Sequence, residues 1–159
     1  MRYRRIALVM AVTLLAGCTA TTAHPAASAP QPRAARSGCG SPIDRGPLPD
    51  WASGGFSGDT SMAHVMGDGG AIVGVLFGDP LVAHRADGKA NKILWVAKDG
   101  AAGPGDLVID ASLDGSGETA RRSVEGGPGP SIVDLPRAGC WRLTLTWPGH
   151  TDTMDLTYG

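Results

Sequence analysis

Two methionines flank a histidine at alternate positions between Met62 and Met66, with His64 in the middle. If this segment is a β-strand, the three side chains point to one face, because alternate residues of a strand do so. Thioether sulfur and imidazole nitrogen are ligands that suit Cu(I). The further ligand that a copper site needs would have to come from His84, His150 or Met154. The competing interpretation is a half-buried strand in which His64 bonds to a backbone group.

Oxygen-bearing side chains recur after Leu113, with Asp114, Ser116 and Glu118 alternating and Glu125 in the twelfth position. This spacing is similar to that of a calcium-binding loop. Thr119, however, stands where the sharp turn of such a loop needs glycine, and no helices flank the segment. The pattern therefore favours a solvated polar loop over 114–129.

Four tryptophans could either stack on a ligand or fill the core. Those on alternating faces of strands are expected to be buried. Trp51 and Trp147 are the two that we expect to be most exposed, and they are the candidates for an aromatic surface that binds sugars or peptides.

The motifs of the common catalytic machineries are missing from the sequence. It contains no Gly-x-Ser-x-Gly, no Gly-rich phosphate loop, no Ser-x-x-Lys and no His-Glu-x-x-His. An enzyme would have to use scattered acids such as Asp68, Asp79 and Asp134, and 15 carboxylates offer no distinguished pair. We therefore expect a protein that is not an enzyme and that uses no cofactor.

The elements that would position these residues are short strands. Between turns rich in Gly and Pro, the apolar runs predict strands at 62–66, 71–77, 92–98, 106–113, 131–135, 140–147 and from 154 onward, with a possible edge strand at 81–83. From 141 to 147, and again from 154 to 158, apolar and polar residues alternate strictly, which predicts a hairpin. No window has a helical period. About 6–8 short strands indicate an all-β fold, an Ig-like or fibronectin-like antiparallel β-sandwich, with a small barrel as the alternative.

The first 38 residues predict export and a lipid anchor. A basic start and a short apolar run end in Leu15-Ala16-Gly17-Cys18, which resembles a bacterial lipobox. We therefore expect a signal peptide at 1–17 and a lipidated Cys18, with an ordinary cleaved signal or an N-terminal membrane anchor as the alternatives. Residues 18–38 would be a disordered tether, since this Ala- and Pro-rich segment lacks large apolar side chains.

The remaining residues, 39–159, are expected to form the folded domain, entered by an irregular lead-in over 40–58. This domain carries nine basic and fifteen acidic residues, a net charge of −6 that argues against a nucleic-acid partner. Of the three cysteines, Cys39 and Cys140 remain if Cys18 carries lipid. In an oxidising compartment these two are expected to form a disulfide, the alternative being two buried thiols.

Three segments carry a family resemblance: Asn-Lys-Ile-Leu-Trp-Val at 91–96, Gly-Pro-Ser-Ile-Val-Asp-Leu-Pro at 129–136, and Gly-Cys-Trp-Arg-Leu-Thr-Leu at 139–145. Their arrangement is similar to that of a group of uncharacterised lipoproteins of actinobacteria, over roughly residues 39–159. The resemblance implies a secreted β-sandwich and brings neither an activity nor site residues.

These observations together predict a lipoprotein on the extracytoplasmic face of the cell membrane. We expect its domain to be a binding or structural module of the cell envelope, held by its N-terminal lipid and contacting another envelope protein. The alternative function is the binding of a small ligand or of copper through Met62, His64 and Met66.

Overall fold

The structure, a computed structural model, describes residues 40–101 and 103–159, which all lie within one compact unit. The predicted signal peptide (1–17) and tether (18–38), with Cys18, and also Cys39, lie outside the described residues. The elements are η1 (Asp50–Ala52), β1 (His64–Met66), β2 (Ile72–Leu76), β3 (Lys92–Ala97), β4 (Leu107–Leu113), β5 (Thr119–Val124), β6 (Pro130–Ile132), β7 (Gly139–Trp147) and β8 (His150–Tyr158). In this part of the chain, no helix is long and apolar enough to cross a membrane.

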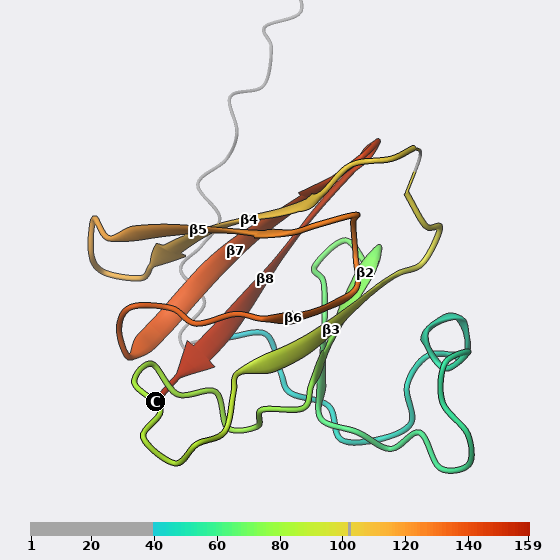
Figure 1. Cartoon of the computed structure of the whole chain (residues 1–159), viewed down its shortest axis with the longest axis horizontal. Helices are drawn as coiled ribbons and strands as arrows, with labels where there is room; N and C mark the ends of the chain where they lie inside the picture. Colours follow the sequence, from blue (N-terminus) through green and yellow to red (C-terminus); the bar gives the residue numbers. More distant parts are fainter. Residues whose placement is uncertain (1–39, 102) are drawn as a thin grey trace, which may run out of the picture. The chain divides into compact units, whose positions relative to one another are not determined.

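The strands form two antiparallel sheets, in the orders β1-β2-β3-β6 and β5-β4-β7-β8, which face each other (Figure 1). The chain passes between the sheets after β3, after β5 and after β6, so that β3 pairs with β6 and β4 with β7. This pairing is similar to that of an immunoglobulin-like sandwich, with β3 and β6 in the places of strands B and E, and with β4, β7 and β8 in the places of C, F and G. The predicted all-β sandwich is confirmed, and the barrel alternative is wrong.

The core between the sheets is built from strictly alternating side chains. On β7 every second residue from Trp141 to Trp147 is at most 2% exposed, and β8 buries Met154, Leu156 and Tyr158, of which Met154 and Leu156 lie opposite Leu143 and Trp141. This confirms the inward faces predicted from the two-residue period. On β2, Gly74 leaves room for Trp95, since a Cβ there would lie 3.1 Å from Cζ3 of that ring.

Tyr158 fastens the end of β8 to the chain after β6. Its hydroxyl donates a 2.6 Å hydrogen bond to the carbonyl oxygen of Val133. Burial raises the pKa of the Tyr158 phenol, and the charge of Asp134 raises it further. The phenol therefore keeps the proton that this bond requires.

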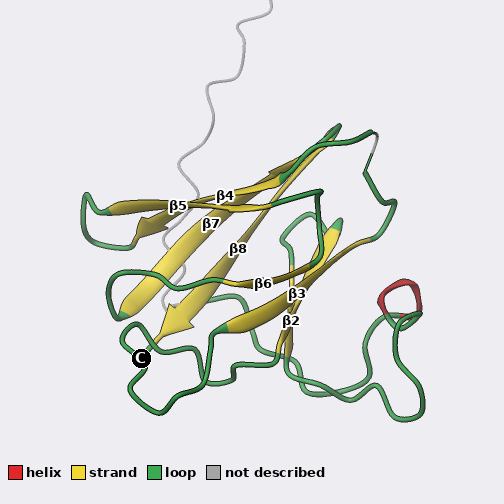
Figure 2. Ribbon diagram, in the orientation of Figure 1, coloured by secondary structure: helices red, strands yellow, loops and turns green. Residues whose placement is uncertain are grey.

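The first sheet has a second apolar layer on its outer side. All of β2 is buried, because Val73 and Val75 pack under the lead-in while the alternate residues face the other sheet. The lead-in pairs with the chain around β1 through the bridges Asp44–His64 and Pro47–Ser61, and it carries η1 (Figure 2). Leu48, Trp51 and Phe56 of the lead-in pack on this layer.

Three expectations about strands are wrong, and the first concerns β5. The polar segment predicted as one loop over 114–129 contains β5, an edge strand whose inward positions hold Ala120, Arg122 and Val124. Arg122 suits that position because its Nε and Nη2 donate to the carbonyl oxygen of Asp134 at 3.0 and 2.6 Å. With one large apolar residue facing inward, the strand has almost no apolar alternation to detect.

The possible edge strand at 81–83 does not form. The amide of Asn91, which is fully buried, takes the place of a neighbouring strand. Its Oδ1 accepts from the backbone N–H of Val82 at 3.0 Å, and its Nδ2 donates to the Val82 carbonyl oxygen at 2.8 Å. The segment expected to be a loop at His150 and Thr151 is instead the start of β8, so that the turn is shorter than predicted.

Candidate functional site

The predicted copper ligands on β1 lie on the outer face of the first sheet. His64 alternates with Val65, which faces the other sheet, while Met62 and Met66 pack against the apolar layer under the lead-in. His64 is 4% exposed, and its Nδ1 donates to the Met62 carbonyl oxygen at 2.7 Å. Met62, His64 and Met66 therefore lie on one face of this segment, as strand alternation predicts. The contacts are those of the competing interpretation, a strand with a backbone-bonded histidine.

The further ligands proposed for copper are placed elsewhere. Met154 is buried between the sheets, and the ring of His150 stacks on Trp147 with centroids 5.2 Å apart. His84 is exposed in the loop after β2. Within residues 40–101 and 103–159, no group of three or more His, Cys, Asp or Glu side chains could hold a metal ion.

The two tryptophans chosen as a ligand surface differ in burial. Trp147 is 2% exposed, and its Nε1 donates to the Gly100 carbonyl oxygen at 3.1 Å, so the expectation that it is exposed is wrong. It ends the inward-facing series of β7, where the loop from Gly100 covers it. Trp51 is half-buried against the layer under the lead-in.

Phenylalanines, which the sequence reasoning did not single out, form the exposed aromatic surface. Phe77 directly follows β2 and is 46% exposed. Phe56 of the lead-in stacks on it with ring centroids 6.5 Å apart, and Lys92 places its Nζ 5.3 Å from the Phe77 centroid. A hollow of about 380 Å³ beside Phe77 is also lined by Lys89 and Lys92. We call Phe56, Phe77, Lys89 and Lys92 the Phe77 patch.

The loop between β2 and β3, beside the Phe77 patch, is held by hydrogen bonds from the Arg85 side chain. Its Nη1 donates to the carbonyl oxygen of Gly78 at 3.0 Å and to Oδ1 of Asn91 at 3.2 Å. Its Nε lies 3.1 Å from Oδ1 of Asp87, and the hydrogen bond from Arg85 lowers the pKa of that carboxyl group. The loop between β2 and β3 is therefore a fixed support for the patch.

The three acids considered for an enzyme are engaged by different partners. Oδ2 of Asp68 lies 2.6 Å from Nη2 of Arg142. Asp79 forms an ion pair of 2.6 Å with Arg45, and Oδ1 of Asp134 accepts from the Asn91 amide. They belong to the β1–β2 turn, the loop after β2 and the segment after β6, and each helps to hold one segment of chain to another.

The calcium-loop spacing does not produce a calcium loop. Strand β5, which spans Thr119–Val124, separates Asp114 from Glu125, so these carboxylates lie at its opposite ends, about 20 Å apart at ~3.3 Å per residue. Glu118 instead pairs with Arg137 at 3.3 Å. The twelve positions cannot surround one ion.

Cys140 is half-buried on β7, directly opposite Thr157 of β8. Gly40, the neighbour of Cys39 in the sequence, lies against the same threonine, since a Cβ on Gly40 would be 3.4 Å from Thr157 Oγ1. The backbone N–H of Ser41 also donates to the Asp155 carbonyl oxygen at 3.3 Å. The described chain therefore begins beside the strand that Cys140 pairs with.

Comparison with family models, with curated proteins and with solved structures finds no match to this chain. The function must accordingly be argued from the residues and their geometry alone.

Proposed function

We propose that this chain is an exported lipoprotein, anchored to the extracytoplasmic face of the cell membrane through Cys18. Its sandwich domain acts, without catalysis, as a binding module for another component of the cell envelope. The lipobox-like sequence ending at Cys18 and the apolar run before it support the anchor. Two or three acyl chains on one residue make membrane attachment stable, whereas a single chain is marginal.

The observation that carries the binding role is the Phe77 patch. A phenylalanine that remains 46% exposed forgoes part of the ~1.5–3 kcal/mol that burying such a side chain contributes. Aromatic side chains are enriched at the centres of protein interfaces, where truncating one often costs much of the binding free energy. Although the domain has a net charge of −6, Lys89 and Lys92 lie beside its exposed aromatic ring. This surface is therefore suited to a partner with acidic groups.

The anchor is tested by fractionating cells that express the full chain. We expect the wild-type protein in the membrane fraction with its N-terminus at Cys18, and the Cys18→Ser variant as a longer, unacylated precursor that keeps residues 1–17, because a lipobox signal is cut only after the thiol is acylated. Mass spectrometry of the wild-type N-terminal peptide should show acyl groups on Cys18. Cleavage of both proteins before residue 18, or a wild-type Cys18 without acyl groups, would contradict the lipid anchor.

The binding role is tested by co-sedimentation of the mature chain, residues 18–159 with Cys18→Ser, with purified cell envelopes, so that neither lipid nor the signal run contributes. We expect Phe77→Ser and Lys92→Glu each to reduce the bound fraction at least about tenfold, the size of effect that losing one interface hot spot of ~1.4 kcal/mol produces. Lys98→Glu is the matched control, because Lys98 is an exposed lysine directly after the other end of β3 and is not part of the patch. Binding unchanged by both patch substitutions would refute the role of this surface.

A further inference from the structure

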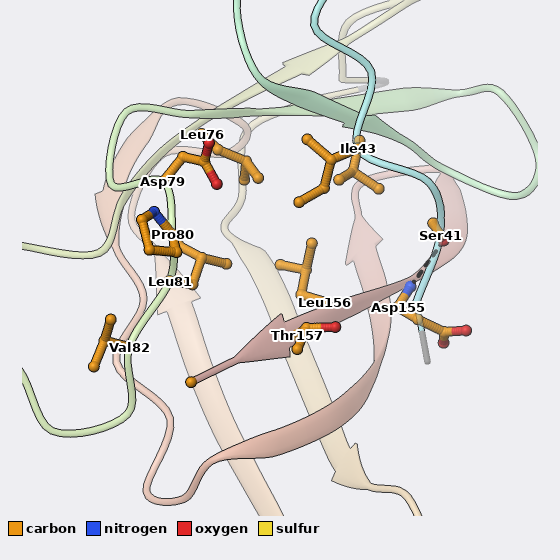
Figure 3. Close-up of a pocket in the computed structure, with 12 residues that line it drawn as sticks. Ser41, Ile43, Leu76, Asp79, Pro80, Leu81, Val82, Asp155, Leu156 and Thr157 are labelled. Carbon is orange, nitrogen blue, oxygen red and sulfur yellow. Dashed lines mark hydrogen bonds between the residues drawn. The ribbon is translucent and has the colours of Figure 1, made fainter. Parts of the chain in front are cut away.

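An apolar pocket opens at one end of the sandwich, between the lead-in, the loop after β2 and the end of β8 (Figure 3). Ile43, Leu76, Leu81 and Leu156 point into the same space, and Val65 also contributes to the lining. Val65, Leu76, Leu81 and Leu156 are at most 4% exposed, whereas Ile43 at the mouth is 44% exposed. The pocket is thus a gap in the main core that reaches solvent.

The size of the pocket suits a short alkyl segment. Its volume is about 310 Å³, at the lower end of the range of roughly 300–1,000 Å³ found for small-molecule sites. At about 30 Å³ for a particle the size of water, it holds on the order of ten non-hydrogen atoms. A straight chain of about ten carbons would fill it.

The polar groups at the rim select against an anionic head group. Asp79 lines the rim, and no lysine, arginine or histidine is among the lining residues. Asp79 is already paired with Arg45 at 2.6 Å, and the carboxyl group of Asp155 points away from the cavity (Figure 3). A neutral head group needs no counter-charge here, whereas a carboxylate would find no cation among the lining residues and would lie near Asp79.

The start of the described chain indicates where such a ligand would come from. Ser41 lines the pocket and is bonded to β8, because its hydroxyl oxygen accepts from the backbone N–H of Asp155 at 3.1 Å. The described chain therefore begins at the rim of the pocket. If Cys18 holds the protein on the membrane, as proposed above, the alkyl chains of membrane lipids are ligands of this kind that the domain would meet at high concentration.

We propose that this pocket binds one alkyl chain of a membrane lipid with an uncharged or zwitterionic head group. The identification of the ligand as a membrane lipid depends on the proposed anchor, whereas the affinity for alkyl chains does not. The pocket is distinct from the Phe77 patch, since Phe77, Lys89 and Lys92 are not among its lining residues.

The test uses the mature chain, residues 18–159, with Cys18→Ser, so that neither an attached acyl chain nor the apolar signal run competes. It is titrated calorimetrically with 1-hexanol, 1-octanol and 1-decanol. Each added CH₂ should tighten binding about fourfold, which is the effect of burying one methylene. Decanoate should bind at least about tenfold more weakly than 1-decanol, because Asp79 stands at the rim and no lining residue supplies a cation. Equal affinity along the alcohol series, or no saturable binding of 1-decanol, would overturn the proposal.

Two substitutions at the mouth assign the binding to this pocket. Ile43→Asp places a charge there and Ile43→Trp fills it, and each should weaken 1-decanol binding at least about tenfold. Ile132→Asp, at the other strongly exposed isoleucine, should leave it unchanged. If 1-decanol binds equally to all of these variants, the site lies elsewhere and the proposal fails. If 1-decanol does not bind while the wild-type protein still fractionates with membranes, the pocket proposal fails and the anchor stands.

Discussion

Replacing Asp152 by alanine should lower the free energy of unfolding by about 3 kcal/mol, since it leaves buried N–H groups without an acceptor. Asp152 is 5% exposed on β8, and its carboxylate lies within the turn that joins β1 and β2. Oδ1 accepts from the backbone N–H groups of Gly69 and Thr153, both at 2.7 Å, and Oδ2 accepts from Ala71 at 2.9 Å. Chemical denaturation followed by the fluorescence of the buried tryptophans measures the loss.

The matched control is Asp110→Ala on β4 of the same sheet. The Asp110 side chain is 53% exposed, and its ion pair with Arg121 is 3.5 Å long. Exposed pairs of this kind contribute about 0–1 kcal/mol, so the control should change stability little. Similar losses for both variants would show that the Asp152 contacts contribute no more than an ordinary surface carboxylate.

A second substitution shows whether Asp152 acts through the turn. A Cβ on Gly67 would have atoms of the Asp152 carboxylate as its three nearest neighbours and would clash with Oδ2. Gly67→Ala should therefore be strongly destabilising in the wild-type protein and nearly neutral in the Asp152→Ala background. Additive effects in this double-mutant cycle would contradict the close packing of the turn around the carboxylate.

The parts of the fold that could be predicted are those in which one physical requirement dominates. β7 and β8 separate two environments, so their residues alternate strictly and the hairpin is readable in the sequence. β3 is apolar on both faces, which is the pattern of a strand buried on both sides. Ile93 and Trp95 do face the core between the sheets, while Leu94 and Val96 face the layer under the lead-in.

Elements that depend on distant partners could not be predicted. β5 forms because β4 supplies partners for its backbone hydrogen bonds and because Arg122 donates to the carbonyl oxygen of Asp134. Both partners lie outside the segment that forms β5. The segment 81–83 has the composition of a strand, but Asn91 occupies the bonds of Val82 that a neighbouring strand would use. In both cases a tertiary contact overrides the local pattern.

The candidate sites likewise include features that follow from the local sequence and features that depend on distant contacts. The shared face of Met62, His64 and Met66 follows from strand alternation, and it was predicted correctly. The Phe77 patch and the pocket could not be predicted, because Phe56, Phe77 and Lys92 are far apart in the sequence. The exposure of Trp147 was misjudged because a loop 47 residues away covers the end of β7.

Breaking the proposed disulfide between Cys39 and Cys140 should cost more stability than removing Asp152. The bond would close a loop of about 100 residues, and restricting an unfolded loop of that length is worth roughly 4–5 kcal/mol. The geometry supports the pairing, since Gly40 lies against Thr157, the residue directly opposite Cys140. Domains of this size are stable by about 5–15 kcal/mol, so a protein without the bond should be only marginally folded.

Thiol counting and denaturation test the pairing in the exported Cys18→Ser chain. Unfolded without a reducing agent, the protein should react with no equivalent of a thiol reagent, and after reduction with two. Cys39→Ser, Cys140→Ser and the double variant should all lose a similar amount of stability, because either single change already breaks the bond. Reductant should lower the stability of the parent chain to the same level and leave the double variant unchanged. Two reactive thiols before reduction would refute the disulfide.

The disulfide would also decide which part of the domain bears the tension of a tether fixed at Cys18. Without it, a pull on residue 39 acts first on contacts at the edge of the sandwich, such as the 3.3 Å bond from Ser41 to Asp155 and the bridge between Asp44 and His64. With it, the pull acts on β7, which is paired on both sides, with β4 and β8. The reduced protein should therefore become sensitive to proteolysis over 40–47 before the sandwich as a whole unfolds, whereas the oxidised protein should resist until global unfolding. Simultaneous cleavage of that segment and loss of the core in the reduced protein would contradict this role.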